Sequence, residues 1–369
     1  MFIIPVFVKA EDVLLAPKAK SVLVMEPSTG SIIYERNSHE KLHPASMTKM
    51  MTMLLIIESV EKGIINLDDM VTVSSNASSM GGSQILLETG EKMSVNDLLK
   101  GIAVASGNDA AVAMAEKIGG TEEAFVAMMN ERAKELGLND TNFKNVHGLD
   151  DVNHYSSAYD MAMIAKELVK HPKILEFTSI YEDYLRKGTD RAFWLVNTNK
   201  LVRFYDGVDG LKTGYTSEAG HCLTATANID GMRIIAVVMG EPDSNTRSSE
   251  VSSIFDYVYA QYALDKVVTK DTDLGEYDVD KGKVNKIKVA PIEDVTILHK
   301  KAEKMDNVTY DIEVDKLIAP INIGNLIGKL TLKQNGVIIK SVPLTVSENV
   351  SKANIFEVFW KNLKDTLSI

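Results

Sequence analysis

The sequence predicts an α+β fold: one antiparallel sheet, built from both ends of a domain, with helices packed on it. A small all-β domain and a C-terminal amphipathic helix follow. Three observations predict this. β-rich runs occupy residues 21–36 and return after residue 207, whereas the pattern from about 44 to 190 is helical. From about 266, short Val- and Ile-rich runs alternate with Lys, Asn-Gly and Gly. Strands that open and close a region filled by helices favour a single sheet covered by helices.

Length and composition limit the class of protein. The chain has 369 residues, of which 45% are hydrophobic and 25% charged, as in soluble globular proteins of two or three domains. The net charge is −11, and the acidic excess lies before residue 281. We therefore expect no nucleic-acid partner, because phosphate contacts need clustered cations. Cys222 is the single cysteine, which excludes an internal disulfide and a cysteine-based metal site.

The elements of the first domain follow from local patterns. Residues 21–27 and 31–36 form a hairpin around Ser28-Thr29-Gly30. Residues 47–60 are apolar nearly all round, which predicts a buried central helix. Further helices are predicted at 94–105, 109–118, 121–136 and 156–170, then strands at 208–216, 220–228 and 232–239, and a closing helix at 250–262.

The all-β domain and the two ends have their own signals. Gln334-Asn335-Gly336-Val337 predicts a tight hairpin. Residues 1–10 begin with the apolar run MFIIPVFV and resemble the end of a signal peptide, the alternative being an N-terminal strand. In residues 351–369, Phe356, Trp360, Leu363 and Leu367 recur at helical spacing among lysines. This predicts a helix lying on the cytoplasmic membrane surface, the alternative being a helix that packs back on the body.

Three short motifs carry the chemistry. They are Ser46-Met47-Thr48-Lys49 at the start of the central helix, Ser106-Gly107-Asn108 between two helices, and Lys212-Thr213-Gly214 on a strand. Each is weak alone, but their order and their predicted structural context make coincidence a poor explanation. The spacing i, i+3 on a helix lets the Lys49 amine reach the Ser46 hydroxyl.

These motifs are the signature of penicillin-binding proteins and class A β-lactamases. The chain resembles one branch more closely, the low-molecular-mass penicillin-binding proteins that act as serine-type D-alanyl-D-alanine carboxypeptidases. The resemblance covers most of residues 20–262, and the β domain and terminal helix match the family's C-terminal layout. Gly107, where lactamases have Asp, agrees with the carboxypeptidase form. The stretches that carry it are EKLHPASMTKMMT, MGGSQILLETGE, LLKGIAVASGNDAAVAMAE, NVHGLDDVNHYSSAYDMA and DGVDGLKTGYTSEAG.

The resemblance implies a β-lactamase/transpeptidase-like fold with a catalytic domain over 11–263 and the small β domain over 264–350. It implies removal of the terminal D-alanine from peptidoglycan stem pentapeptides through an acyl-enzyme, which limits cross-linking. It also implies covalent inhibition by penicillin and other β-lactam antibiotics, and no metal or organic cofactor. With a signal-peptide remnant and a membrane-anchoring helix, we expect an exported protein at the outer face of the cytoplasmic membrane or in the cell wall.

The residue types suit this reaction. A serine hydroxyl needs a base, and Lys49 can serve only when neutral; burial and the nearby cation Lys212 would both lower its pKa. Ser106 could relay the proton to the leaving amine, and Asn108 could hold a substrate amide. Lys212 and Thr213 could bind the terminal carboxylate, and Gly214 would let the strand approach the substrate backbone closely.

Two further residues are assigned by the resemblance. The backbone N–H groups of Ser46 and Tyr215 would form an oxyanion hole. Arg247 would be a second anchor for the substrate carboxylate, the alternative being a surface or helix-start arginine. One cluster resembles a metal site, but for it we expect turn, cap and other structural hydrogen bonds instead. It consists of His147, Asp150, Asp151 and His154.

Three rival functions remain. A serine β-lactamase would need rapid deacylation, for which class A enzymes use a glutamate in an E-x-x-L-N pattern that the sequence lacks. A D,D-endopeptidase would use the same motifs. A non-catalytic cell-wall-binding scaffold would be expected to have lost one motif, and none is broken.

Overall fold

The computed structural model describes residues 13–354 except 304, together with Glu357. The chain divides after Ala260 into two compact units, and each is described by itself. The predicted signal-peptide remnant at 1–10 lies outside the described residues, and so does most of the predicted amphipathic helix at 351–369. Residues 351–354 are described and are not helical, because Lys352 forms a β-bridge with Gly282. Within the described residues, no helix has both the length and the hydropathy that a membrane span requires.

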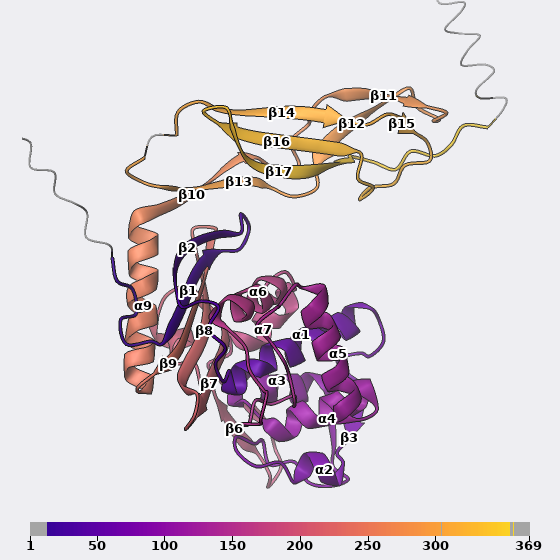
Figure 1. The fold of residues 1–369 in the computed structure, drawn as a ribbon. Coiled ribbons are helices and arrows are strands. Elements are labelled where there is room, and N and C mark those ends of the chain that lie inside the picture. The colour runs from indigo at the N-terminus through magenta and orange to yellow at the C-terminus, as the bar shows by residue number, and fades with distance from the viewer. Residues whose placement is uncertain (1–12, 304, 355–356, 358–369) are drawn as a thin grey trace, which may run out of the picture. The chain divides into compact units, whose positions relative to one another are not determined.

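A five-stranded antiparallel sheet organises the first unit (Figure 1). Its strand order is β2-β1-β9-β8-β7, so the first strands of the chain pair with strands some 200 residues later, as Val22 opposite Val238 shows. The sheet is thus built from both ends of the unit, as the sequence predicts. Its strands are β1 (Ser21–Glu26), β2 (Ser31–Arg36), β7 (Val208–Thr216), β8 (Gly220–Ile229) and β9 (Met232–Glu241).

Helices cover both faces of this sheet. Figure 1 shows α9 (Ser244–Gln261) on one face and the remaining helices gathered on the other. Several begin at a side-chain cap: the hydroxyls of Ser94, Thr121 and Ser157 each accept a backbone N–H three residues on. The gathered helices are η1 (Ala45–Thr48, a 3-10 turn), α1 (Lys49–Glu61), α2 (Ser75–Ser78), α3 (Val95–Ala105), α4 (Asn108–Gly119), α5 (Glu122–Glu135), α6 (Ala158–Leu168), α7 (Pro172–Thr178) and α8 (Leu201–Phe204).

The core surrounds α1, which is buried from Lys49 to Ser59 and therefore apolar on nearly every side, as predicted. Two predicted boundaries are wrong. The helix predicted at 156–170 ends at Leu168, and a new helix starts at Pro172, whose fixed φ suits a first helical position. The helix predicted at 250–262 begins at Ser244, because the Asp243 carboxylate accepts the N–H groups of the first turn.

Two small antiparallel strand pairs flank the helices, and the connection within each pair includes a loop. One pairs β3 (Met70–Thr72) with β4 (Lys92–Ser94), and the other pairs β5 (Glu182–Leu185) with β6 (Phe193–Val196).

The second unit is all-β, as predicted. A six-stranded sheet in the order β14-β16-β17-β12-β11-β15 and a β10-β13 pair enclose a core of Val, Ile and Leu. Asn335 and Gly336 have positive φ angles of 50° and 80°, and Gln334 lies opposite Val337, so the predicted tight hairpin is confirmed. The strands are β10 (Tyr262–Val268), β11 (Glu276–Asp280), β12 (Lys286–Pro291), β13 (Val295–Lys300), β14 (Val308–Val314), β15 (Leu317–Ile318), β16 (Gly328–Gln334) and β17 (Val337–Val346).

Candidate active site

Ser46 stands in the 3-10 turn η1, directly before α1, and is half-buried. Two glycines allow other segments of the chain to approach this turn closely. A Cβ at Gly148 would collide with the Ala45 carbonyl, and one at Gly214 would lie 2.7 Å from the Pro44 oxygen and 3.3 Å from the Ser46 nitrogen. The close approach predicted for Gly214 is therefore made to the segment that carries Ser46. These contacts hold the serine against strand β7.

Lys49 is one turn along the chain, and its Nζ lies 2.9 Å from Ser46 Oγ. The amine donates to Asn108 Oδ1 at 2.6 Å and to the His147 carbonyl at 2.7 Å. The side chain is fully buried, and no ion pair joins it to a carboxylate of the described residues. Burial, together with the charge of Lys212, holds the pKa of Lys49 well below its ordinary value, as predicted, although Asp109 acts in the opposite direction. A neutral amine with two hydrogens on these two acceptors directs its lone pair toward the serine hydroxyl.

Ser106 and Asn108 bracket the break between α3 and α4. Ser106 ends α3 in the left-handed conformation with φ of 62°, a strained position for a residue other than glycine. Asn108 begins α4 and reaches Lys49. A Cβ at Gly107 would lie 3.0 Å from the Asp109 carboxylate and 3.3 Å from Ile85. Tight packing therefore favours glycine in the middle of this motif.

Lys212, Thr213 and Gly214 lie on β7, the edge strand of the sheet. Lys212 is 1% exposed and donates to the Thr213 carbonyl at 3.1 Å. Burial, and then the charge of Arg247, lowers the pKa of Lys212 to about 7. Arg247 lies in the first turn of α9, at a helix start as the alternative allowed, but it is not a surface residue. Its side chain is 5% exposed, and its Nε has no hydrogen-bond partner within the described part of the chain. Two buried cations thus stand together at one end of the site.

A cavity of about 580 Å³ joins these elements. Ser46, Ser106, Thr213, Gly214, Tyr215 and Arg247 line it, while Lys49, Asn108 and Lys212 lie buried behind this wall. The structure therefore brings all the sequence-predicted site residues together. The lining includes no carboxylate among the residues described. Sequence reasoning missed several further lining residues that belong to none of the three motifs, among them Ser83, Thr198, Lys200 and Phe204.

Two walls of the cavity have visible supports. Thr213 Oγ1 donates to Thr198 Oγ1 at 2.7 Å, which fixes the motif threonine. The Tyr215 ring, 60% exposed, stacks on His221 with ring centroids 4.3 Å apart. His221 is therefore part of the wall rather than a residue packed under the sheet.

His147 and His154, two members of the cluster that resembles a metal site in the sequence, make structural hydrogen bonds, as expected. His154 Nδ1 accepts the Lys144 N–H, which leaves Nε2 to donate to Thr48 Oγ1 at 2.8 Å. His147 Nδ1 accepts the Leu149 N–H. Burial lowers the pKa of His147 to about 3 and that of His154 to about 4, so both rings are neutral.

A second group of possible metal ligands lies further along α1. It consists of Glu58, Glu167 and His171. The Arg132 guanidinium already occupies the space between the two carboxylates, 2.8 Å from Glu58 and 3.1 Å from Glu167. We interpret the group as an ion-pair network.

Comparison with known proteins agrees with this geometry. Residues 8–243 match the family model described as D-alanyl-D-alanine carboxypeptidase, and residues 262–352 match the C-terminal domain of penicillin-binding protein 5. The chain belongs to this carboxypeptidase family. The D-alanyl-D-alanine carboxypeptidase DacF of Bacillus subtilis is 49% identical over 352 residues, which cover 95% of this chain and 90% of that protein.

Solved structures extend the family likeness to the fold. Penicillin-binding protein 5 of Haemophilus influenzae superposes with a TM-score of 0.75 at 33% identity, covering 93% of this chain and all of that one. Penicillin-binding protein D2 of Listeria monocytogenes, solved with ampicillin bound, matches 66% of this chain and 98% of its own length, with a TM-score of 0.59 at 29% identity. The protein is accordingly a penicillin-binding serine peptidase with D-alanyl-D-alanine carboxypeptidase activity, and its fold is the mixed α/β fold of that family with an all-β C-terminal domain.

Proposed function

We propose that Ser46 Oγ attacks the carbonyl carbon between the last two D-alanines of a peptidoglycan stem pentapeptide, and that Lys49 takes the hydroxyl proton. One observation carries this proposal: the buried Lys49 amine stands 2.9 Å from Ser46 Oγ and has a lowered pKa. A neutral amine within hydrogen-bond reach of the nucleophile is what general-base catalysis needs.

The other roles follow the geometry of the cavity. The N–H groups of Ser46 and Tyr215 stabilise the oxyanion, and removing one such donor typically costs about 3–4 kcal/mol of barrier stabilisation. Asn108 fixes the amine of Lys49 and offers its amide to the substrate. The C–N bond then breaks, Ser106 passes a proton to the departing D-alanine nitrogen, and an acyl-enzyme remains. Water releases the tetrapeptide and regenerates the serine.

The substrate's free carboxylate is held by Lys212, Thr213 and Arg247. The buried Arg247 Nε without a partner supports this assignment, because a buried N–H group that lacks an acceptor is costly until an anion accepts its hydrogen bond. Binding at this end requires a free carboxylate on the leaving residue, which the terminal D-alanine of a stem pentapeptide supplies. In the wall, shortening the donor peptides in this way limits cross-linking.

Slow deacylation after penicillin follows from the cavity lining. A class A β-lactamase uses a dedicated glutamate to activate the deacylating water. The described residues that line the cavity include no Asp or Glu, and Glu167 is paired with Arg132 and Lys170 on α6. We therefore expect a long-lived penicilloyl adduct on Ser46.

Mixing the protein with a fluorescent penicillin and measuring the intact mass over time tests this assignment. A stable adduct that maps to Ser46, together with D-alanine release from a pentapeptide that Ser46→Ala abolishes, is the expected result. Rapid return to the free mass would indicate a lactamase. No adduct and no release would indicate a non-catalytic wall-binding scaffold.

The place of action is also a proposal. The apolar start at 1–10 and the aromatic and lysine pattern at 351–369 support export and attachment to the outer face of the cytoplasmic membrane, with 264–350 as a spacer. Removing residues 352–369 should free the protein from membrane pellets and leave D-alanine release intact. Continued sedimentation of the shortened protein with membranes would contradict the anchor.

A further inference from the structure

A loop between α2 and β4, residues 80–91, supports the catalytic centre from outside the three motifs. Its carbonyls hold Asn108: the Gly81 oxygen accepts from Asn108 Nδ2 at 2.7 Å, and the Ser83 oxygen accepts the Asn108 backbone N–H at 2.7 Å. With its amide nitrogen fixed in this way, Asn108 turns Oδ1 toward the Lys49 amine, 2.6 Å away. The position of the proposed base thus depends on the conformation of a loop.

The 80–91 loop has no regular secondary structure from Met80 to Thr89, so it cannot hold its own shape by a ladder of backbone hydrogen bonds. Asp109 secures the inner side, because its buried carboxylate accepts the N–H groups of Ile85 and Leu87 at 3.0–3.1 Å. Ile85 also packs against Gly101 and Gly107. These contacts hold the backbone N–H groups of Ile85 and Leu87 and leave the carbonyls of Ile85 and Leu86 to other partners.

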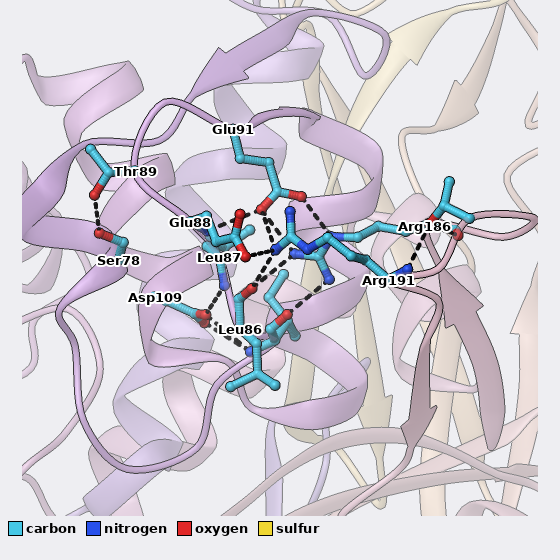
Figure 2. Close-up of polar contacts among 11 residues, drawn as sticks. Ser78, Leu86, Leu87, Glu88, Thr89, Glu91, Asp109, Arg186 and Arg191 are labelled. Atoms are coloured by element: carbon cyan, nitrogen blue, oxygen red, sulfur yellow. Dashed lines mark hydrogen bonds and ion pairs between the residues drawn. The ribbon is translucent and has the colours of Figure 1, made fainter.

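Arg186, on the β5–β6 hairpin, binds both of these carbonyls, and Arg191 of the same hairpin also donates to the Leu86 carbonyl at 3.3 Å (Figure 2). The Arg186 guanidinium donates to the Ile85 carbonyl at 3.0 Å and to the Leu86 carbonyl at 3.2 Å. It also makes a two-pronged ion pair with Glu91, at 2.5 Å from Nε and 3.1 Å from Nη2. Figure 2 shows Arg186 and Arg191 converging on the same carboxylate. One side chain therefore holds the middle of the loop and its end at once.

The Arg186–Glu91 pair is shielded from solvent: the two side chains are 9% and 12% exposed. Burial opposes the charge of Glu91, but the hydrogen bond from Arg186 and neighbouring charges outweigh it, so the pKa of Glu91 lies below its usual value. The pair consequently stays charged at every pH at which the enzyme would be assayed. Leu86, between the two anchors, has φ of 55°, a conformation that a leucine keeps only when its surroundings impose it.

We propose that Arg186 is a positioning residue for the reaction: by clamping the 80–91 loop it fixes Asn108, and through Asn108 it fixes the Lys49 amine beside Ser46. This inference rests on the proposed role of Lys49. It assigns a catalytic consequence to a hairpin arginine that belongs to no motif and does not line the cavity as described.

The proposal makes a prediction that a merely structural arginine would not. When the clamp is lost, water reaches Lys49 through the loosened loop, and the pKa of Lys49 rises toward its ordinary value. Because Lys49 acts when neutral, the acid limb of the pH–rate profile then moves to higher pH. An arginine needed only for folding would instead lower the fraction of active protein and leave the profile of the remaining molecules in place.

The experiment compares the full chain with Arg186→Ala and Glu91→Gln. The second-order rate constant for acylation by a fluorescent penicillin is measured per active site, between about pH 5 and pH 10, with labelling stoichiometry as the active-site count. For Arg186→Ala we expect a rate constant lowered about 10- to 100-fold near neutral pH, the range that a displaced catalytic group produces, and a midpoint shifted upward. Glu91→Gln keeps the carbonyl contacts and should shift the midpoint in the same direction by less.

Arg36→Ala is the matched control. Arg36 also holds backbone carbonyls, those of Leu15, Ala16 and Ala19, but on strand β2 and without contact to the 80–91 loop. It should leave rate and midpoint unchanged. If Arg186→Ala loses active fraction without a midpoint shift, or matches the control, the proposal is overturned. If Arg186→Ala does not fold, Glu91→Gln decides alone, an unchanged midpoint overturning the proposal. A failure of the unmodified chain to be acylated would instead overturn the proposed function.

Discussion

Replacing Lys49 by methionine tests the proposed base most directly. Methionine fills a similar volume and keeps α1 apolar, but it can neither accept nor donate the serine proton. Loss of a positioned general base lowers rates by about 10²–10⁴-fold, or about 3–5 kcal/mol of barrier. We expect the rate constant for Ser46 acylation to fall by a factor within this range at neutral pH. The remaining rate should no longer vary with pH as the Lys49 amine titrates.

The structure also sets the cost of this change in stability. Asn108 Oδ1 and the His147 carbonyl lose their donor, and a buried acceptor left unsatisfied costs about 1–3 kcal/mol. Removing a fully buried amine offsets part of this loss. The folded protein should therefore persist with its free energy of unfolding changed by a few kcal/mol at most.

The pH dependence of stability gives an independent signature. The folded protein releases the Lys49 proton at a pKa well below the ordinary 10.5, whereas the unfolded chain keeps it up to that value. Between the two, the unfolded state binds more protons, so the free energy of unfolding rises with pH. Lys49→Met should flatten this rise in the window that extends up to about pH 10.5.

The assay is time-resolved labelling with a fluorescent penicillin, paired with thermal unfolding at several pH values. Lys62→Met, an exposed lysine at the other end of the same helix, is the control and should acylate normally. If Lys49→Met is folded and labels Ser46 at more than about a tenth of the normal rate, Lys49 is not the base. A stability curve as steep as that of the unmodified protein would contradict the lowered pKa.

Two further changes probe the rest of the site, and a third probes Glu241, a buried residue at the end of β9. Lys212→Gln should lower kcat/KM for D-alanine release by about 10- to 100-fold, as loss of a charged hydrogen bond does. The effect should be smaller on a substrate whose C-terminal carboxylate is amidated. Equal losses on both substrates would show that Lys212 does not bind the carboxylate. Gly214→Ala should slow acylation strongly, because its Cβ would meet the Pro44 oxygen at 2.7 Å; normal labelling would show that β7 can move away from Ser46. Burial and Glu250 raise the pKa of Glu241 from 4.5 to about 8. The folded state therefore binds more protons than the unfolded state between these two values, and the free energy of unfolding falls as pH rises from 4.5 to about 8. Glu241→Gln should raise the unfolding temperature more at pH 9 than at pH 5; an equal effect at both would contradict the raised pKa.

The sequence predicts the features that local patterns control. Alternation and turn residues locate the sheet strands and the Asn335-Gly336 hairpin, and the apolar surround of 47–60 identifies α1. The start of α9 escaped prediction, because residues 244–249 are polar and their helix depends on the Asp243 cap and on burial of Arg247. Polar residues with no apolar period give no signal in the sequence.

Parts of the site depend on contacts between segments far apart in the chain. Ser106 belongs to a sequence motif, and Arg247 stands at a position that the family resemblance identifies. Thr198 has no such signal, and its role becomes visible only from its hydrogen bond with Thr213 in the fold. The Arg186–Glu91 pair joins residues 95 positions apart, through a loop and a hairpin that no periodicity marks. Such residues are defined by the tertiary fold, and single-sequence patterns do not contain that information.

The causes that lower the pKa of Lys49 explain how one site can both bind an anion and keep a neutral base. Lys212 lowers the pKa of Lys49, yet the proposed function gives Lys212 to the substrate carboxylate, whose negative charge would cancel that influence. If the charge of Lys212 were the main cause, substrate binding would protonate the base and stop the reaction. Burial is instead the largest cause, ahead of Lys212. Because a bound peptide excludes more water from the cavity, it strengthens the larger effect while it weakens the smaller one. Lys49 therefore remains able to accept the Ser46 proton in the complex, where that proton must move.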